Sequence, residues 1–164
     1  ALIYQHLKTA YENGQDKEAR SSMLRAAYCA GVAFTKSYVG YIHAVAHSLG
    51  GQYGTPHGLA NAVILPIVLR MYGPACWKKL ARLARNAGVV EAGLSDEETA
   101  GCFINWIQEM NDSMEIPRHF PEIRRKDIPV MARHADKEGN PLYPVPVLMN
   151  RRELERIYEE VKGR

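Results

Sequence analysis

The sequence predicts an all-α fold, and three observations support that prediction. Apolar residues recur at intervals of three and four over most of the chain, which is the period of an amphipathic helix. The alternation of apolar and polar residues that marks a half-buried strand is almost absent. Glycine, proline and capping residues divide the chain into segments of helical length. The predicted helices cover residues 2–13, 16–36, 41–49, 56–72, 75–86, 95–111 and 151–161.

Glycines mark the boundaries of the first three predicted helices. The first helix stops at Asn13-Gly14, where glycine adopts the left-handed conformation of a C-cap. Gly40 precedes the third helix, which we expect to break at Gly50-Gly51. The second helix carries an apolar stripe made by Ala19, Met23, Ala26, Ala27, Ala30 and Phe34.

The next three helices are predicted from capping and charge. Thr55 and Pro56 are typical of an N-cap and a first helical residue, and Pro66 is expected to kink the helix that follows. Ser95 and Glu98 have the spacing of a capping box, which starts the sixth helix. The fifth helix has a basic face, expected to be exposed, made by Lys78, Lys79, Arg82 and Arg85.

Proline-rich segments lie in the last third of the chain. Residues 116–129 hold three prolines and a basic cluster, which predicts a loop with at most one short helix. Residues 140–146 hold three more prolines and are predicted to form no regular structure. The final helix follows at 151–161.

Composition excludes several classes of protein. A length of 164 residues predicts about one domain, and 46% apolar with 24% charged residues is typical of a globular chain. The net charge of +3 is too small to indicate a nucleic acid or an anionic membrane as partner. The longest apolar run, at 62–69, is far shorter than the ~20 residues of a membrane span.

The cysteines and the first residues carry separate information. Three cysteines without a CxxC pair indicate a reducing compartment, so we expect a cytoplasmic protein. Cys29, Cys76 and Cys102 lie on apolar helix faces and are expected to be unreactive core thiols. The chain begins without Met and already within a helical pattern, so we interpret it as part of a longer protein.

Three of the six histidines fall within residues 43–57. His43 and His47 are four apart and share a helix face, and His57 follows a glycine-rich loop at the start of the next helix. Two antiparallel helices can therefore bring all three imidazoles around one metal centre. The alternative, in which these histidines are surface or core residues that donate to carbonyls, stays open on spacing alone. No Glu lies between the paired histidines, so the metalloprotease pattern is not met.

The segment HAVAHSLGGQYGTPHGLANAVILP closely resembles the second signature of the iron-containing alcohol dehydrogenases. The preceding RAAYCAGVAFTKSYVGYIHA and the later NPLYPVP also match, so the resemblance covers essentially the whole chain. It implies the multi-helix C-terminal domain shared by dehydroquinate synthase-like proteins and these dehydrogenases. Residues 1–164 are then one metal-binding domain, and the N-terminal nucleotide-binding domain lies outside this chain.

The resemblance also assigns roles to residues. His43 and His57 match two metal ligands, while the other two, in an upstream D-x-x-x-H motif, are not in this chain. His47 matches a position near the nicotinamide and substrate, where it would move protons. The resemblance therefore implies two histidine ligands, His43 and His57, in place of the three that spacing suggests. Phe34 matches an aromatic position of the substrate pocket. Gly58 is expected to leave room for metal or substrate, the alternative being an ordinary helix-start residue.

For the full-length protein the resemblance implies reversible hydride transfer between a small alcohol or aldehyde and NAD or NADP. The implied metal is Fe²⁺, with Zn²⁺ as a possible substitute, and the full-length protein is expected to be a homo-oligomer. This chain alone is expected to be inactive. Two alternatives are a non-catalytic helical association domain and a glycerol-dehydrogenase-like metal enzyme on the same fold. The NPLYPVP segment favours the alcohol dehydrogenase branch.

Overall fold

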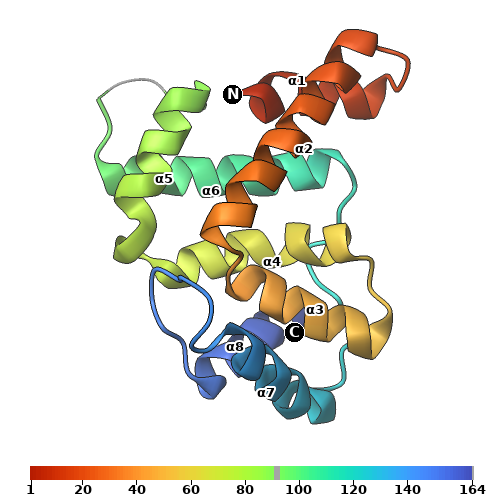
Figure 1. Ribbon diagram of the computed structural model, residues 1–164, viewed down its shortest axis with the longest axis vertical. Coiled ribbons are helices and arrows are strands. Elements are labelled where there is room, and N and C mark those ends of the chain that lie inside the picture. The colour runs from red at the N-terminus through yellow and green to blue at the C-terminus, as the bar shows by residue number, and fades with distance from the viewer. Residues whose placement is uncertain (91–92, 164) are drawn as a thin grey trace. The chain divides into compact units, whose positions relative to one another are not determined.

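A computed structural model describes residues 1–90 and 93–163, and every regular element in these ranges is a helix (Figure 1). The predicted all-α fold is confirmed. None of the described helices combines the length and apolar character needed to cross a bilayer.

The chain divides into two compact units, each built from two stretches of sequence. The first comprises Ala1–Tyr38 and Cys76–Met110, and the second Val39–Ala75 and Asn111–Arg164. The expected single domain over 1–164 therefore stays a prediction.

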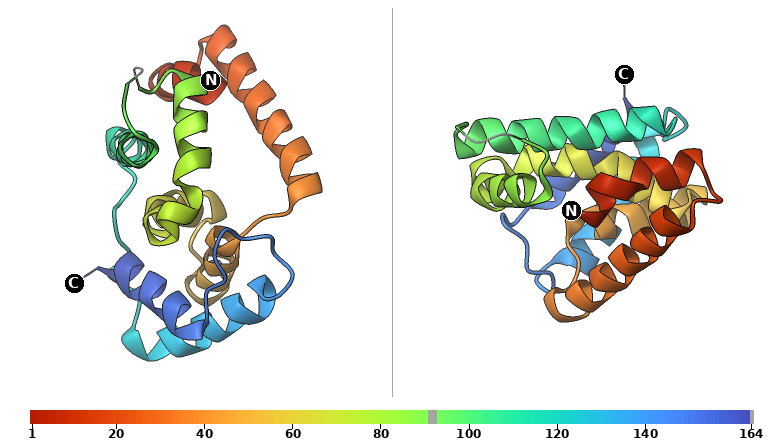
Figure 2. Two further views of the ribbon diagram at one scale, coloured as in Figure 1. Left: turned by 90° about the vertical axis from the view of Figure 1, so that its left-hand side faces the viewer. Right: turned by 90° about the horizontal axis from the view of Figure 1, so that it is seen from above.

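In the first unit, α1 (Leu2–Glu12) packs against α2 (Lys17–Ser37), as the red and orange ribbons of Figure 2 show. The Asp16 carboxylate accepts a hydrogen bond from the Ala19 backbone N–H at 2.9 Å, which caps the start of α2. The predicted boundary between the two helices is confirmed to within one residue.

The exposed second half of α2 differs from the predicted apolar stripe. Ala19 and Ala26 are buried, but Ala27, Ala30 and Phe34 are exposed, because no part of the described first unit covers them. The prediction of three core thiols is likewise wrong for two of them. Cys76 is buried, whereas Cys29 on α2 and Cys102, in the helix that starts at Asp96, are exposed.

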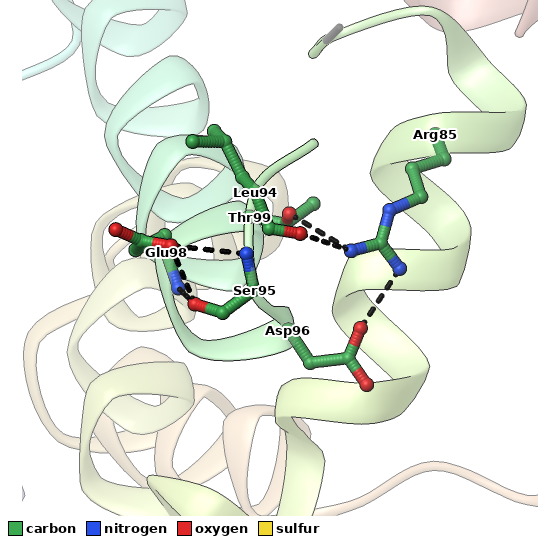
Figure 3. A network of polar contacts seen from close by, with 6 residues as sticks. All are labelled: Arg85, Leu94, Ser95, Asp96, Glu98 and Thr99. Atoms are coloured by element: carbon green, nitrogen blue, oxygen red, sulfur yellow. Dashed lines mark hydrogen bonds and ion pairs between the residues drawn. The ribbon is translucent and has the colours of Figure 1, made fainter. Parts of the chain in front are cut away.

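The predicted capping box starts α6 (Asp96–Ser113), close to the end of α5 (Pro74–Ala87) (Figure 3). The Ser95 N–H donates to the Glu98 carboxylate at 3.0 Å, and the Glu98 N–H donates to the Ser95 hydroxyl at 3.2 Å. The Ser95 hydroxyl also donates to the Glu98 carboxylate at 2.6 Å, and this hydrogen bond, followed by the one from the Ser95 N–H, lowers the pKa of Glu98. Arg85 on α5 donates to Asp96 at 2.8 Å, which joins the two helices.

The second unit is a bundle of four main helices with a short 3-10 turn, η1, and it holds all three clustered histidines. The helix α3 packs against both α4 and α7, and α8 packs against α7 and α4 (Figure 1). The bounds of these elements are α3 Tyr41–Tyr53, α4 His57–Tyr72, η1 Arg125–Asp127, α7 Ile128–Gly139 and α8 Arg151–Lys162.

The helix α3 continues one turn beyond the predicted break at Gly50-Gly51. It ends at Tyr53, and its C-cap Gly54 has a φ of +69° and donates its N–H to the Gly50 carbonyl at 2.8 Å. A helical glycine costs about 1 kcal/mol relative to alanine, which tertiary contacts readily offset. Here Tyr53 in the extra turn donates its hydroxyl to Asp127 at 2.7 Å.

Pro56 also takes a different place from the predicted one. It is the N-cap of α4, so the helix begins at His57 and the expected N-cap, Thr55, lies one residue earlier. Pro66 lies inside the helix and is buried, and the kink expected there stays a prediction. His57 is therefore the first residue of the helix.

The helix α7 was not predicted, and it begins where a proline-rich loop was expected. Pro129 lies in the first turn of this helix, where its missing N–H has no helical partner to lose. At the other end, a Cβ on Gly139 would meet the Tyr41 ring at 2.8 Å, so only glycine permits this close packing of α7 on α3. The buried face of α7 has helical spacing and includes Ile128, Met131, Ala132 and Ala135.

Tyr158 is fully buried on α8, in the centre of the second unit. Its hydroxyl donates to the Val45 carbonyl of α3 at 3.1 Å, and the Met131 carbonyl of α7 lies at 3.5 Å. Burial raises the pKa of Tyr158 well above its usual value. The phenol therefore joins three helices in its protonated form.

Tyr158 should make the second unit sensitive to alkali. Its pKa in the folded state lies above the value of about 10 in the unfolded chain, so its contribution is complete below pH 10 and is lost as the pH rises further. Unfolding in urea should show the free energy of unfolding falling above about pH 10, with a Tyr158 component of up to about 1.4 kcal/mol per pH unit. Tyr158→Phe should lack that component; an identical pH slope in the variant would contradict this account.

Candidate metal and proton-transfer site

Three imidazole rings meet in the second unit. His43 and His47 lie one turn apart on α3, and their ring centroids are 6.0 Å apart. His57, the first residue of α4, has its ring centroid 5.4 Å from that of His43 and 5.0 Å from that of His47. The structure therefore brings together the three residues whose spacing indicated one site.

The surroundings of His57 include a polar atom without a partner. Asn61, one turn further along α4, has its Nδ2 2.9 Å from His57 Nε2. Asn61 Oδ1 is buried and has no hydrogen-bond partner among the described residues. The chain itself therefore does not satisfy all the polar groups of this corner.

The charge state of His43 suits a metal ligand. Burial, followed by the neighbouring His57 and His47, lowers the pKa of His43, and the charge of Glu138 opposes this only in part. The ring is therefore neutral at neutral pH, and a neutral imidazole is the form that binds metal ions.

His47 has a carboxylate partner from another helix. Its Nδ1 lies 2.7 Å from Glu138 Oε1 on α7, and the two side chains are 45% and 33% exposed. The same carboxylate oxygen accepts a hydrogen bond from the Tyr143 hydroxyl at 2.8 Å. Burial, then this hydrogen bond and the charge of Glu138, raise the pKa of Tyr143. A pocket of about 360 Å³ beside this group is lined by His47, Ser48, Gly51, Gln52, His134 and Glu138.

No group of three or more His, Cys, Asp or Glu side chains in the described ranges converges closely enough to hold a metal ion. The three-histidine metal site suggested by spacing is therefore not formed, although the rings are close. Phe34 lies in the first unit, 53% exposed, beside a groove of about 430 Å³. The roles given to His43, His47, His57 and Phe34 stay predictions.

Glu138, Tyr143 and Asn61 were missed by the sequence analysis. Asn61 follows His57 at a spacing of four on the same helix, and that spacing was a usable signal. Glu138 is 91 residues from His47 and lies on the unpredicted α7, so no local pattern joins the pair.

Gly58 follows His57 and is open on the side where a Cβ would project. Apart from the adjacent residues and the backbone of its own helix, no atom of the described chain lies within 4 Å of that position. Gly58→Val should therefore leave the melting temperature of the full-length protein nearly unchanged, because valine has no lower helix propensity than glycine and its side chain would project into open space. If metal or substrate occupies this space, the variant's kcat/KM should fall; unchanged turnover with lower stability would favour the ordinary helix-start interpretation.

Comparison with known proteins places this chain in a family. The model of the Fe-containing alcohol dehydrogenase family, C-terminal part, matches residues 1–161. The 1,3-propanediol dehydrogenase of Citrobacter freundii is 37% identical over 161 residues, which are 97% of this chain and 41% of that protein. Alcohol dehydrogenase 4 of Saccharomyces cerevisiae is 41% identical over 138 residues, which are 82% of this chain and 35% of that protein.

Solved structures agree with this placement. A crystal structure of 1,3-propanediol oxidoreductase matches with a TM-score of 0.90 and 38% identity, over 96% of this chain and 41% of that one. An alcohol dehydrogenase from Oenococcus oeni matches with a TM-score of 0.90 and 33% identity, over 98% of this chain and 42% of that one. The chain thus spans about two fifths of the length of these relatives. It belongs to the iron-containing alcohol dehydrogenase family and corresponds to the family's C-terminal domain.

Proposed function

We propose that the protein containing this chain is a metal-dependent dehydrogenase that transfers hydride between a small alcohol and NAD or NADP. The observation that carries this proposal is the cluster of His43, His47 and His57, with ring centroids 5.0 to 6.0 Å apart, in a chain of the iron-containing alcohol dehydrogenase family. The family membership favours this proposal over a purely associative helical domain.

The residues present fit a metal ion as two of its ligands. His43 and His57 offer imidazole nitrogens, the lowered pKa of His43 favours its neutral form, and a metal at His57 Nε2 would replace the Asn61 amide as partner of that atom. Nitrogen ligands of this kind suit Fe²⁺ and Zn²⁺. When bound, the ion supplies Lewis acidity toward the substrate oxygen. We propose that the remaining ligands come from the part of the protein outside this chain.

His47 is proposed to handle the proton of the reaction. A primary alcohol and NAD⁺ give an aldehyde, NADH and one proton: the carbon loses a hydride to the nicotinamide, and the hydroxyl loses the proton. Imidazole exchanges protons near neutral pH, and the 45% exposure of His47 lets it pass that proton to water. Glu138 stabilises the ring that carries it.

The names of the relatives support a small substrate. They include 1,3-propanediol dehydrogenases, a lactaldehyde reductase of Escherichia coli and an NADPH-dependent butanol dehydrogenase of Clostridium saccharobutylicum. A short aliphatic alcohol or aldehyde is therefore the proposed substrate class. We propose that Phe34, exposed on α2, contributes an apolar wall to its pocket.

Further proposals concern the whole protein. Its relatives are about two and a half times as long as this chain, so the nucleotide-binding domain is proposed to lie in the remainder. A homo-oligomeric state and a cytoplasmic location stay predictions; the three free cysteines support a reducing compartment.

The proposal is tested on the full-length protein, stripped of metal and then reloaded without oxygen with Fe²⁺ or Zn²⁺. Absorbance of the reduced nicotinamide should rise with 1,3-propanediol or 1-butanol and NAD⁺ or NADP⁺, and only in the metal-loaded protein. The reverse reaction with the matching aldehydes should consume it. Absence of metal-dependent turnover in both directions would overturn the proposal.

A further inference from the structure

We propose that Glu138 is a positioning residue that fixes the tautomer and orientation of His47, and that Tyr143 holds Glu138 in place for this task. The proposal rests on the proposed function, because it explains how His47 is prepared for proton transfer. It adds two residues from a helix and a segment that the histidine motif does not include.

The tautomer follows from the chemistry of the contact. An ionised carboxylate can only accept hydrogen bonds, so the 2.7 Å contact between Glu138 Oε1 and His47 Nδ1 places a proton on Nδ1. In the neutral ring Nε2 is then the nitrogen with the free lone pair, the form a proton acceptor needs. Carboxylate partners fix histidine tautomers in this way in many enzymes.

The orientation follows from two contacts on the same ring. One edge of His47 is held by Glu138, and one face is stacked on His57, with centroids 5.0 Å apart and planes 20° apart. A ring held at an edge and a face cannot rotate freely about its side-chain bonds. His47 therefore stays beside the proposed ligand His57 while remaining 45% exposed.

Tyr143 restricts the carboxylate itself. Its hydroxyl donates to the same oxygen, Glu138 Oε1, at 2.8 Å. The oxygen facing His47 thus has a second donor from the segment that follows α7, which favours one rotamer of a side chain that is 33% exposed. A flexible surface glutamate would hold a histidine far less well, because ordering it costs side-chain entropy.

A purely structural role is the alternative, since Glu138 also joins α7 to the segment that holds Tyr143. The chain offers a matched control for this. Asp136, two residues earlier on α7, accepts a hydrogen bond from Asn140 Nδ2 at 2.7 Å and so makes a similar link without touching His47. Asp136→Asn weakens the link alone, whereas Glu138→Gln also changes the partner of His47.

The first arm of the experiment is kinetic and uses the metal-loaded full-length enzyme. Glu138→Gln should lower kcat by about 10–100-fold, with the KM for the alcohol and the metal content close to wild type, as expected for loss of a supporting partner. Tyr143→Phe should lower kcat less, and Asp136→Asn should leave it within about twofold. Glu138→Asp, which keeps the charge, should recover part of the lost kcat. Equal losses of kcat in Glu138→Gln and Asp136→Asn would overturn the proposal.

The second arm is spectroscopic and needs neither metal nor turnover. Nitrogen-15 chemical shifts of labelled histidine in the metal-free full-length protein report the tautomer of His47, assigned by the signal missing in His47→Asn. Wild type should show the Nδ1–H form. Glu138→Gln should show a mixture, because a glutamine amide can donate as well as accept.

An Nε2–H form in wild type, or an unchanged tautomer in Glu138→Gln, would overturn the positioning role. This arm also separates the two proposals. A protein with the expected shifts but no metal-dependent alcohol turnover would remove the proposed function and leave the Glu138 contact established. An active enzyme with the wrong shifts would do the reverse.

Discussion

Replacing His57 with alanine in the full-length protein should remove most of the bound metal and lower kcat/KM by at least about 10³-fold. That factor corresponds to the several kcal/mol of transition-state stabilisation that a catalytic metal supplies. The fold should tolerate the change, because His57 is exposed at the first residue of α4 and its side chain contacts Asn61 and the rings of His43 and His47, none of which is fully buried. Metal content by mass spectrometry, kinetics and the melting temperature together measure these effects.

The matched control for His57 is a histidine outside the second unit. His6→Ala, on α1, changes the same residue type and should leave metal content and kcat/KM at wild-type values. Full metal occupancy in His57→Ala, with kcat/KM within tenfold of wild type, would show that His57 is not a ligand.

Replacing His47 with alanine should separate proton transfer from metal binding. The metal content should stay close to wild type, because His47 is not among the proposed ligands. The kcat should fall by about 10²–10⁴-fold, the usual contribution of a general acid or base. Small primary amines or imidazole added to the assay should restore part of the rate if the missing group is a proton carrier.

Loss of metal together with activity in His47→Ala would contradict the division of roles among the three rings. It would instead favour the three-histidine metal site that spacing alone suggests, although no such group converges in the described ranges. The two variants together therefore test which histidines bind the metal: His57→Ala should lose it and His47→Ala should keep it.

Local signals predicted most of the helices and the histidine cluster. A spacing of four places His43 and His47 on one face of α3, and the glycine-rich turn returns the chain so that His57 meets them. Capping is equally local, and the Ser95 box starts α6 as predicted. Such features depend on a few neighbouring residues, so the sequence expresses them directly.

Features that depend on distant contacts were missed. The prediction ended α3 at Gly50-Gly51, one turn too early. The extra turn is held by the hydrogen bond from Tyr53 to Asp127, which joins residues 74 apart and so leaves no local pattern in the sequence. It left out α7 because Pro129 was interpreted as part of a loop rather than of a helical first turn. With α7 absent, Glu138 could not be placed beside His47.

Burial was mispredicted where an apolar helix face is not covered by another element. The stripe of α2 has helical spacing, yet Ala27, Ala30 and Phe34 are exposed in this chain, as are Cys29 and Cys102. Periodicity shows which face of a helix is apolar, but it contains no information about whether another element covers that face.

Anomalous diffraction from crystals of the full-length protein loaded with Zn²⁺ tests the central claim most directly, namely that His43 and His57 ligate one metal ion and His47 does not. The account predicts one anomalous peak at the zinc edge about 2.0–2.1 Å from a ring nitrogen of both His43 and His57. His47 should lie outside that distance, with its Nδ1 still within hydrogen-bond distance of the Glu138 carboxylate. A peak bound to His47, or a metal site that leaves out either His43 or His57, would contradict the account.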